Sequence, residues 1–506
     1  MNTTDDLDGD GTPGQQGDWD LAQPAYGNPN YGLWIKNLAW AHFKAELTED
    51  GFVKISWKGV EVTPPGGIAT SFSPIPGRIV FGGRTGGSWL VHQVDNIKLV
   101  TVPADKIVIS KVVGMPTGFA ITVIDSGQSV LNPNSVQLKL NGNTVPVTSV
   151  SKVASTGTST IRSSGTPLTA GSTNRVDITA SDGIGNTVTG TKNFIVPGYY
   201  LLPASFAASG VDTTKPGFKF KVHQLDLAQT LPTSVARAER QLHGDIGANV
   251  ANVASLTPAS GGFYSEPAVI NYEQGDAGGA PLPAGNFTNE VLIPGIPGNV
   301  SITDRSLDNI AMEILTYIQF PAAGSYKITF NSDDGFRTYV GDHAVDVLSS
   351  PIFSQADVAR GASDTAQWIY VAQAGAYPFR TVWFEGGGGA SLEWSAENDA
   401  GVKALINDSS VTGALKAYQE ATGAKPAAVT YAYPDRSSGN PYFANDPITI
   451  EWTDGTTLLN KSSIQLSVND TPVTGTQTTA GAVTKLQYSP PAPGWASGSN
   501  NKVTLV

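Results

Sequence analysis

Short runs of alternating apolar and polar residues recur along the chain and predict strands rather than helices. Phe52 to Trp57 and Tyr326 to Phe330 alternate with a period of two, as expected for strands with one buried face. Trp368 to Ala372, Tyr377 to Phe384 and Ala390 to Trp394 are rich in the aromatic and β-branched residues that favour strands. The pattern predicts an all-β chain.

Two segments have a helical composition instead. Ser234 to His243 and Asn407 to Thr422 contain Ala, Leu, Glu and Lys. Asp408 or Ser409 is a plausible N-cap for the second segment, and Gly423 is a plausible stop. We therefore expect short helices here.

The segment from Ile107 to Val196 has the turn spacing of a seven-strand immunoglobulin-like sandwich. Within it, Val136 to Asn143 predicts a hairpin, because Asn141-Gly142 supplies the positive φ of a type I′ turn. Such units are usually spacers, and nothing in this one resembles a catalytic group.

Parts of this sandwich recur near the end of the chain. Three matches carry the repeat: Ile121 to Asp125 with Ile448 to Asp454, Ser135 to Asn141 with Ser463 to Asn469, and Ala170 to Val176 with Ser497 to Val503. The second copy stops at Val506, whereas the first continues to Val196. A sandwich without its last strand has an open edge. We therefore expect either a piece of a longer chain or a strand supplied by another molecule.

Composition and charge exclude several classes of function. A chain of 506 residues allows three or four domains at about 150 residues each. The net charge is -12 and the 31 Lys and Arg are scattered, so nucleic acid and anionic membranes are poor partners. The absence of cysteine excludes disulfides, thiolate metal sites and a cysteine nucleophile.

The chain start lacks the basic and apolar regions of a signal peptide, and no apolar run reaches the ~18 residues of a membrane span. Taken literally, this predicts a soluble cytoplasmic protein. Because both ends look cut, we expect instead a secreted or cell-surface location.

The turn at Asp333 and Asp334 is the strongest candidate for a metal site. Two adjacent carboxylates lie between two strand-like runs, and such a turn offers the hard oxygen ligands that calcium prefers. Asp and Gly are also ordinary hairpin residues. Both interpretations stay open on spacing alone.

A second acidic segment lies near the N-terminus. Asp6, Asp8 and Asp10 have the D-x-D-x-D-G spacing of a calcium loop. Its twelfth position is Gly17, where an EF-hand needs a bidentate Glu. An acidic surface loop therefore ranks above an EF-hand, with a looser calcium loop as the alternative.

Four blocks of the central region resemble the domain shared by anthrax protective antigen, yeast flocculins and many bacterial glycosidases. The blocks are Gly324 to Phe330, Ser332 to Asp342, Ala374 to Arg380 and Ala390 to Trp394. The resemblance extends over about 286 to 397. It implies that Asp333 and Asp334 correspond to the two aspartates of the lectin members, which are joined by a cis peptide and bind calcium, and that the calcium binds sugar hydroxyls.

The resemblance also implies a second calcium-binding loop after the strand Tyr377 to Phe384. Lectin members place an Asn and backbone carbonyls there, whereas this sequence has Glu385 followed by Gly386, Gly387, Gly388 and Gly389. Glu385 is expected to substitute as a ligand, or the glycine loop to serve through its carbonyls alone.

Arg337 and Tyr339 project from one side of the strand that follows the Asp333 turn. We expect them either to flank a sugar, with Tyr339 stacked on an apolar ring face, or to cover the sheet.

A glycine-rich region nearer the N-terminus resembles the closing strands of concanavalin-like or laminin-G-like jelly rolls. Gly77 to Phe81, Arg84 to Gly87 and His92 to Ile97 carry this resemblance. It covers about half of such a domain. The absent half normally holds the sugar-binding loop, so no lectin site is expected in this region.

Enzymatic chemistry is not expected within the chain. The sequence contains neither an H-E-x-x-H zinc motif nor a G-x-S-x-G elbow. The carboxylate pair Asp333 and Glu385 would be used by calcium. The five histidines are widely separated: His42, His92, His223, His243 and His343.

The sequence therefore predicts tandem β-sandwich domains with a few short helices. The expected boundaries are an acidic segment at 1–30, a partial jelly roll at 31–103, an immunoglobulin-like domain at 104–200, a linker at 201–231, a protective-antigen-like domain at 232–422 and a truncated immunoglobulin-like domain at 423–506.

The leading functional hypothesis is a non-catalytic, calcium-dependent glycan-binding or adhesion segment of a large secreted or cell-surface protein. Its expected partners are a glycan or cell-surface polysaccharide, neighbouring copies, or further domains of a longer chain. The alternatives are a structural fibre or surface-layer subunit, and an accessory region of an extracellular glycoside hydrolase.

Overall fold

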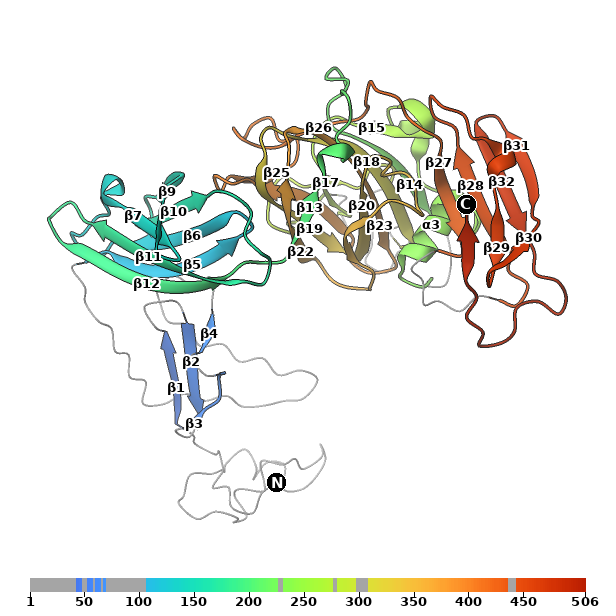
Figure 1. Ribbon diagram of the computed structural model, residues 1–506. Coiled ribbons are helices and arrows are strands. Elements are labelled where there is room, and N and C mark those ends of the chain that lie inside the picture. The colour runs from blue at the N-terminus through green and yellow to red at the C-terminus, as the bar shows by residue number, and fades with distance from the viewer. Residues whose placement is uncertain are drawn as a thin grey trace, which may run out of the picture. The chain divides into compact units, whose positions relative to one another are not determined.

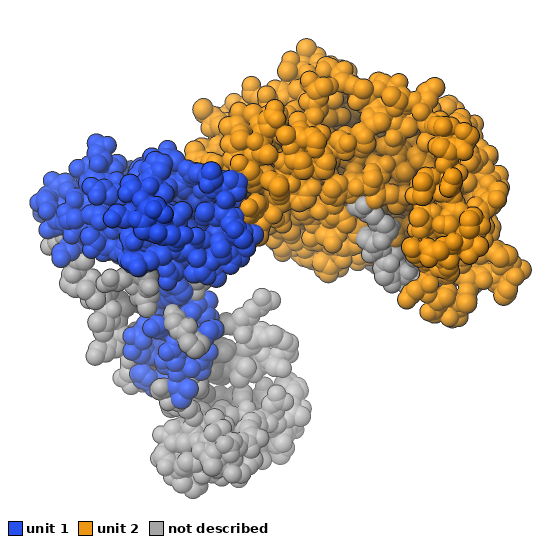
Figure 2. All heavy atoms as spheres, in the orientation of Figure 1, with its two compact units in different colours: residues 1–197 blue, residues 198–506 orange. Residues whose placement is uncertain are grey.

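The computed structural model describes residues 42–47, 52–57, 60–64, 67–69, 106–225, 231–275, 280–296, 308–435 and 443–506. The chain divides into two compact units, Met1–Pro197 and Gly198–Val506 (Figure 2). Both are built from mostly antiparallel sheets with few helices (Figure 1), so the predicted all-β class is confirmed. The predicted domain boundaries stay predictions.

The first unit contains a small N-terminal sheet of order β1-β2-β3, with β4 paired to β2. Its strands are β1 (Phe43–Leu47), β2 (Phe52–Trp57), β3 (Val60–Glu61) and β4 (Ile68–Ala69). The strand predicted at Phe52 to Trp57 is thus confirmed. The other strands expected of the partial jelly roll, at Gly77 to Phe81 and His92 to Val100, lie outside the described residues.

The rest of the first unit is a sandwich of two four-stranded sheets with orders β5-β6-β10-β9 and β12-β11-β7-β8. The strands are β5 (Val108–Met115), β6 (Gly118–Ile124), β7 (Gln137–Leu140), β8 (Asn143–Val145), β9 (Ser149–Val153), β10 (Thr158–Ser164), β11 (Thr173–Ser181) and β12 (Thr187–Ile195). Asn141 and Gly142 have φ of 50° and 86°, which confirms the predicted tight hairpin between β7 and β8.

The second unit is centred on a larger sandwich of two seven-stranded sheets. One has the order β13-β22-β19-β24-β16-β17 with β25 on β24, and the other has the order β15-β14-β18-β23-β20-β21 with β26 on β18 (Figure 1). Its strands are β13 (Tyr199–Leu202), β14 (Phe218–Gln224), β15 (Tyr264–Glu266), β16 (Asn271–Glu273), β17 (Val291–Leu292), β18 (Ile310–Phe320), β19 (Gly324–Asp333), β20 (Gly335–Val340), β21 (Ile352–Ala356), β22 (Ser363–Val371), β23 (Gly375–Glu385), β24 (Ser391–Glu397), β25 (Lys403–Leu405) and β26 (Lys416–Tyr418).

The core of this sandwich is aromatic and lies between the two sheets. Phe330 of β19 stacks on Phe336 of β20 with ring centroids 4.5 Å apart, and Trp394 of β24 lies 5.0 Å from Phe330. All three side chains are buried. The alternation predicted for Tyr326 to Phe330 therefore directs apolar side chains inward, and the polar residues between them face outward.

The single α-helix among the described residues is α3 (Val235–His243), which packs on the outer face of β18 and β23. Ser234 caps it, since its Oγ accepts a hydrogen bond from the Arg237 backbone N–H at 3.3 Å. Gly244 ends it with φ of 92°. The helix predicted at Ser234 to His243 is confirmed.

The helix predicted at Asn407 to Thr422 is wrong. This segment contains turns and the short strand β26, which pairs with β18. Asn407 and Gly413 have φ of 73° and 92°, which no helix interior allows. Leu415 and Ala417 enter the aromatic core, so burial against the sheet outweighs the helical composition.

The C-terminal sandwich has sheets of order β27-β28-β32-β31 and β30-β29-β33. Its strands are β27 (Ala428–Tyr433), β28 (Ile448–Thr453), β29 (Leu466–Val468), β30 (Thr471–Val473), β31 (Thr476–Ala480), β32 (Val483–Tyr488) and β33 (Val503–Leu505). The internal repeat stays a prediction.

Short 3-10 helices occur in both units, at Pro133–Ser135, Ala204–Phe206, Val253–Ser255, Ser260–Gly262 and Lys461–Ser463.

Helix α3 and the loop after β20 connect the central sandwich to the C-terminal one. The His243 ring stacks on Tyr431 with centroids 3.7 Å apart, and His243 Nε2 lies 3.0 Å from the Glu451 carboxylate. The Val347 N–H donates to the Val429 carbonyl at 2.8 Å, and the Val347 side chain belongs to the core of the C-terminal sandwich. The two sandwiches therefore share buried surface.

In the described part of the chain, no helix combines the length and the apolar character needed to cross a membrane.

Candidate metal centre of the central sandwich

The turn between β19 and β20 holds Asp333 and Asp334 at one end of the central sandwich. Their peptide bond is cis, as the resemblance implied. Trp383 Nε1 donates to the Asp333 carbonyl at 3.2 Å, and Ser332 Oγ donates to the Asp334 carbonyl at 2.7 Å. A Cβ on Gly335 would lie 2.3 Å from the Ala356 carbonyl oxygen, so only glycine fits after the two aspartates.

Glu385, the last residue of β23, joins the two aspartates. β23 pairs with β20, so that Phe384 lies opposite Gly335. The pairing places the end of β23 beside the turn. Carboxylate oxygens of Asp333, Asp334 and Glu385 all lie within 4.8 Å of one another. The structure thus brings Glu385 to two adjacent aspartates that lie about fifty residues earlier in the sequence.

The Glu385 carboxylate is completely buried, and neither of its oxygens has a hydrogen-bond partner. Burial, reinforced by the negative charges of Asp334 and Asp333, raises the pKa of Glu385 to about 9. Burial and the charge of Asp334 raise the pKa of Asp333 to about 7. Unpartnered buried carboxylate oxygens are costly, and a cation among them would remove that cost.

Two backbone amides orient the Asp334 side chain. Oδ1 accepts the Arg360 N–H at 2.8 Å, and Oδ2 accepts the Gly386 N–H at 3.0 Å. The Arg360 side chain donates from Nη2 to Ser332 Oγ at 2.6 Å. Arg360 therefore holds the turn in position through its hydrogen bonds to Asp334 and Ser332. No sequence pattern marks this role, because the loop before β22 is adjacent to the turn only in the fold.

The glycine loop after Glu385 lies directly against the carboxylates. A Cβ on Gly389 would stand 2.9 Å from Asp333 Oδ2, and one on Gly386 would stand 2.6 Å from Thr233 Cγ2. Gly388 has φ of 109° and open space around it. The loop can therefore approach the site only as bare backbone.

Asp308 is a fourth carboxylate near the site. A Cβ on Gly387 would lie 3.5 Å from the Asp308 carboxylate, and the Asp308 charge contributes to the raised pKa of Glu385. Sequence reasoning missed it, because no local pattern marks a single Asp that precedes a strand, here β18, distant in sequence from the Asp333 turn.

Arg337 and Tyr339 lie elsewhere, on the outer face of β20. Arg337 donates to Asp357 and Asp435, each at 3.0 Å, and Tyr339 lies under Arg380, whose guanidinium is 5.4 Å from the ring centroid. Arg337 and Tyr339 are each 2% exposed.

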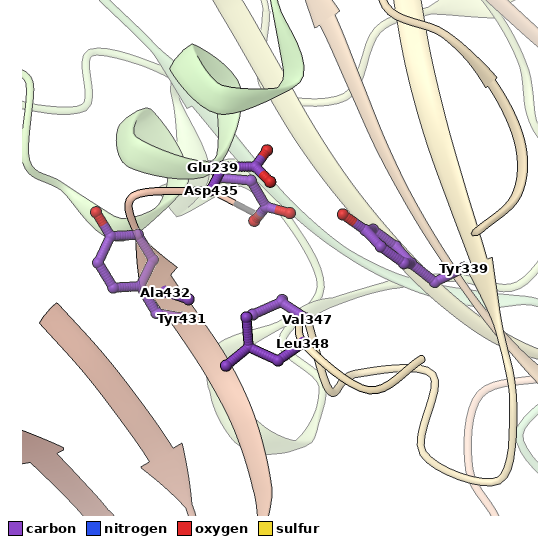
Figure 3. Close-up of a pocket in the computed structure, with 7 residues that line it drawn as sticks. All are labelled: Glu239, Tyr339, Val347, Leu348, Tyr431, Ala432 and Asp435. Carbon is purple, nitrogen blue, oxygen red and sulfur yellow. The ribbon is translucent and has the colours of Figure 1, made fainter. Parts of the chain in front are cut away.

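Figure 3 shows Tyr339 directed from β20 toward Glu239 and Asp435, at a cavity of about 10 Å³. This space holds about one water molecule. Because Asp435 belongs to the C-terminal region, Arg337 and Tyr339 contribute to the interface between the central and C-terminal sandwiches. Their predicted contact with a sugar has no counterpart in this geometry.

The residues of the carboxylate cluster fit a calcium ion. Calcium takes six to eight hard oxygen ligands, and the cluster offers only acceptors, two of them buried and unpartnered. The other predicted calcium ligands, Asp6, Asp8 and Asp10, lie outside the described residues.

Comparison with known proteins gives a family for this sandwich. Residues 272–405 match the model of the PA14 domain family. No curated protein matches the chain.

Three solved structures illustrate the similarity. The A domain of epithelial adhesin 9 from Candida glabrata, in complex with Galβ1-4GlcNAc, is 11% identical, with 43% of this chain and 97% of that chain covered and a TM-score of 0.28. The PA14 sugar-binding domain of an RTX adhesin is 14% identical, with 38% and 94% covered and a TM-score of 0.25. The PA14 domain of the MpAFP antifreeze protein is 13% identical, with 41% and 93% covered and a TM-score of 0.26. The family model confirms the resemblance seen in the sequence, and the central sandwich of this chain contains a PA14 domain at residues 272–405.

Proposed function

We propose that this chain is a non-catalytic, calcium-dependent glycan-binding or adhesion segment of a secreted or cell-surface protein. The observation that carries the proposal is the buried Glu385 carboxylate, whose two unpartnered oxygens lie within a cluster completed by Asp333 and Asp334. Without a cation, three neighbouring carboxylates destabilise the folded protein by repelling one another when ionised. With calcium they form a binding site.

Asp333, Asp334 and Glu385 would hold the ion beside the glycine loop that follows Glu385. Calcium, when bound, offers coordination positions that vicinal sugar hydroxyls can take. Gly386, Gly387 and Gly388 follow Glu385 as bare backbone. Gly386 already donates to Asp334 and accepts from Asn309, so Gly387 and Gly388, the second with open space around it, are the positions whose backbone groups would meet a flat, hydroxyl-rich ligand. The ligand class is therefore a glycan or cell-surface polysaccharide.

Glycosidase chemistry fits this site less well. A catalytic carboxylic acid must reach the glycosidic oxygen of its substrate, whereas Glu385 has no exposed surface. Asp334 is held by two backbone amides and is 6% exposed. The carboxylates are placed to bind an ion and not to transfer protons to a sugar.

The test is calcium titration by calorimetry, followed by glycan-array binding with calcium and with EGTA. The D333N/D334N variant is expected to lose this calcium site and calcium-dependent glycan binding. Asp342→Asn is the matched control, because Asp342 follows the same hairpin and its side chain is 61% exposed.

Two outcomes would contradict the proposal. Unchanged calcium binding in D333N/D334N would remove the metal site. Calcium binding without any glycan signal would make the ion a structural one and favour the spacer or surface-layer alternative.

A further inference from the structure

A buried polar row crosses the outer face of the other sheet of the central sandwich. Glu393 of β24 lies opposite Asn331 of β19 and Asn271 of β16, and Asn331 lies opposite Asp364 at the edge of β22. Their chain neighbours, such as Phe330 and Trp394, point into the core. The row therefore faces away from the core.

A loop covers this row and removes it from solvent. Glu393, Asn271 and Asn331 are 3%, 2% and 7% exposed. Glu393 Oε2 accepts the backbone N–H groups of Asn286 and Phe287, each at 2.9 Å, and Oε1 accepts Asn286 Nδ2 at 3.2 Å. All three donors are neutral, so these hydrogen bonds leave the charge of Glu393 without a counter-charge.

Hydrogen bonds fix the orientation of both amide side chains. Asn331 Nδ2 donates to Asp364 Oδ1 at 2.8 Å, and Asn271 Nδ2 donates to the Thr288 carbonyl at 3.2 Å. In both residues the other end of the amide, Oδ1, is buried and has no donor. Because oxygen and nitrogen diverge from Cγ, the Asn331 oxygen turns away from Asp364 and toward the Glu393 side of the row.

The row thus places the acceptor oxygens of the two amides beside the acceptor oxygens of the Glu393 carboxylate. Fifteen buried polar atoms lack a partner among the described residues. Two of them, Asn271 Oδ1 and Asn331 Oδ1, belong to the residues that lie opposite Glu393 on its two neighbouring strands. Native structures leave few such atoms unpaired. Two unpaired oxygens on the two strands that flank one buried carboxylate indicate a missing positive group.

We propose that Glu393, flanked by Asn271 and Asn331, binds a second calcium ion, at a site separate from the Asp333 cluster. In-register side chains on adjacent strands have Cβ atoms about 5 Å apart. This spacing allows carboxylate and amide oxygens to converge on an ion at about 2.4 Å. The ion would compensate the charge of Glu393 and thereby fix the loop that Asn286 and Phe287 anchor to it.

The first experiment reads calcium stoichiometry by calorimetry in the full chain. Glu393→Gln is expected to bind one calcium fewer than the parent. Glu397→Gln, a change on the same strand β24 but outside the row, is expected to keep the parental stoichiometry. Combining Glu393→Gln with D333N/D334N is expected to remove two ions. A calcium site elsewhere in the chain would contribute equally to every variant, so it does not affect these differences in stoichiometry. Equal stoichiometry in parent and Glu393→Gln would overturn the proposal, with a buried water left to satisfy the amide oxygens.

The second experiment needs no change at the row itself. In D333N/D334N, millimolar calcium is expected to raise the melting temperature of the second unit, because the proposed site binds only the folded chain. Magnesium at equal concentration is the control, since it demands a tighter octahedron. A melting temperature that calcium leaves unchanged in D333N/D334N would also overturn the proposal. The comparison of the parent with Glu393→Gln depends neither on glycan binding nor on the Asp333 cluster, and the second experiment is made with that cluster removed.

Discussion

Calcium affinity at the Asp333 cluster is expected to rise steeply with pH. In the metal-free protein, burial and neighbouring charges raise the pKa of Glu385 to about 9 and that of Asp333 to about 7. A carboxylate binds calcium as the anion, so each retained proton must leave as the ion enters.

The size of the effect follows from the number of protons released. Each proton changes the affinity tenfold per pH unit, or about 1.4 kcal/mol. The logarithm of the association constant should rise with a slope of about two below pH 7 and about one between pH 7 and pH 9, and then level off. From pH 6 to pH 8 the affinity should increase about a thousandfold, a hundredfold below pH 7 and tenfold above it.

Stability of the metal-free protein is expected to change in the opposite sense. Both pKa values lie above the ordinary 4.5 of Glu and 3.8 of Asp, so the folded state keeps protons that the unfolded chain has lost. The contribution of these groups to the free energy of unfolding is fully present below about pH 4. It is lost as pH rises through about 7 and about 9.

Calorimetry at pH 6, 7 and 8, in two buffers with different ionisation enthalpies, measures both the affinity and the protons released. Asp342→Asn should follow the parent curve, because Asp342 is exposed and outside the cluster. Calcium binding that is equally tight at pH 6 and pH 8, with no proton release, would refute the assignment of Glu385 as a ligand.

Three substitutions test other parts of the structure. Glu385→Gln should leave the free energy of unfolding of the metal-free protein at pH 7 within about 1 kcal/mol of the parent value, since an amide replaces a protonated acid of the same shape. Its calcium affinity should fall at least about tenfold. Urea denaturation measures the stability and calorimetry measures the affinity. Arg337→Ala should cost about 3–5 kcal/mol in urea unfolding, because it removes a buried guanidinium that pairs with both Asp357 and Asp435. By contrast, Asp470→Asn, in an exposed pair, should cost less than about 1 kcal/mol. Gly388→Ala should cost about 1–2 kcal/mol at its φ of 109°, and Gly361→Ala, in open space at ordinary φ, should cost less; equal melting temperatures would contradict the strain.

Sequence pattern was sufficient for many of the strands and for two of the three carboxylates of the candidate metal centre. Phe52 to Trp57 and the alternation before Asp333 follow directly from burial on one face of a sheet. Asp333 and Asp334 stood out because they are adjacent in the chain. Glu385 required the family resemblance, since β-sheet pairing and not chain proximity brings it to the turn.

The errors share one physical cause, namely contacts between segments distant in sequence. Asn407 to Thr422 has helical composition, yet Leu415 and Ala417 gain more from the aromatic core than from helix formation. Arg337 was expected either to flank a sugar or to cover the sheet, and Asp435, about a hundred residues later, pairs with it. The row around Glu393 was equally invisible, because its members are each unremarkable in their own segment.

Helix α3 makes the central and C-terminal sandwiches thermodynamically dependent on each other. Its Arg237 donates to the Glu385 carbonyl at 2.8 Å, and its His243 stacks on Tyr431. Unfolding either sandwich would therefore strip partners from a helix that the other one needs. The second unit should consequently unfold in one cooperative heat-absorbing transition. Calcium bound at the Asp333 cluster should then raise the melting temperature of the C-terminal sandwich as well, although its strands do not contact the ion.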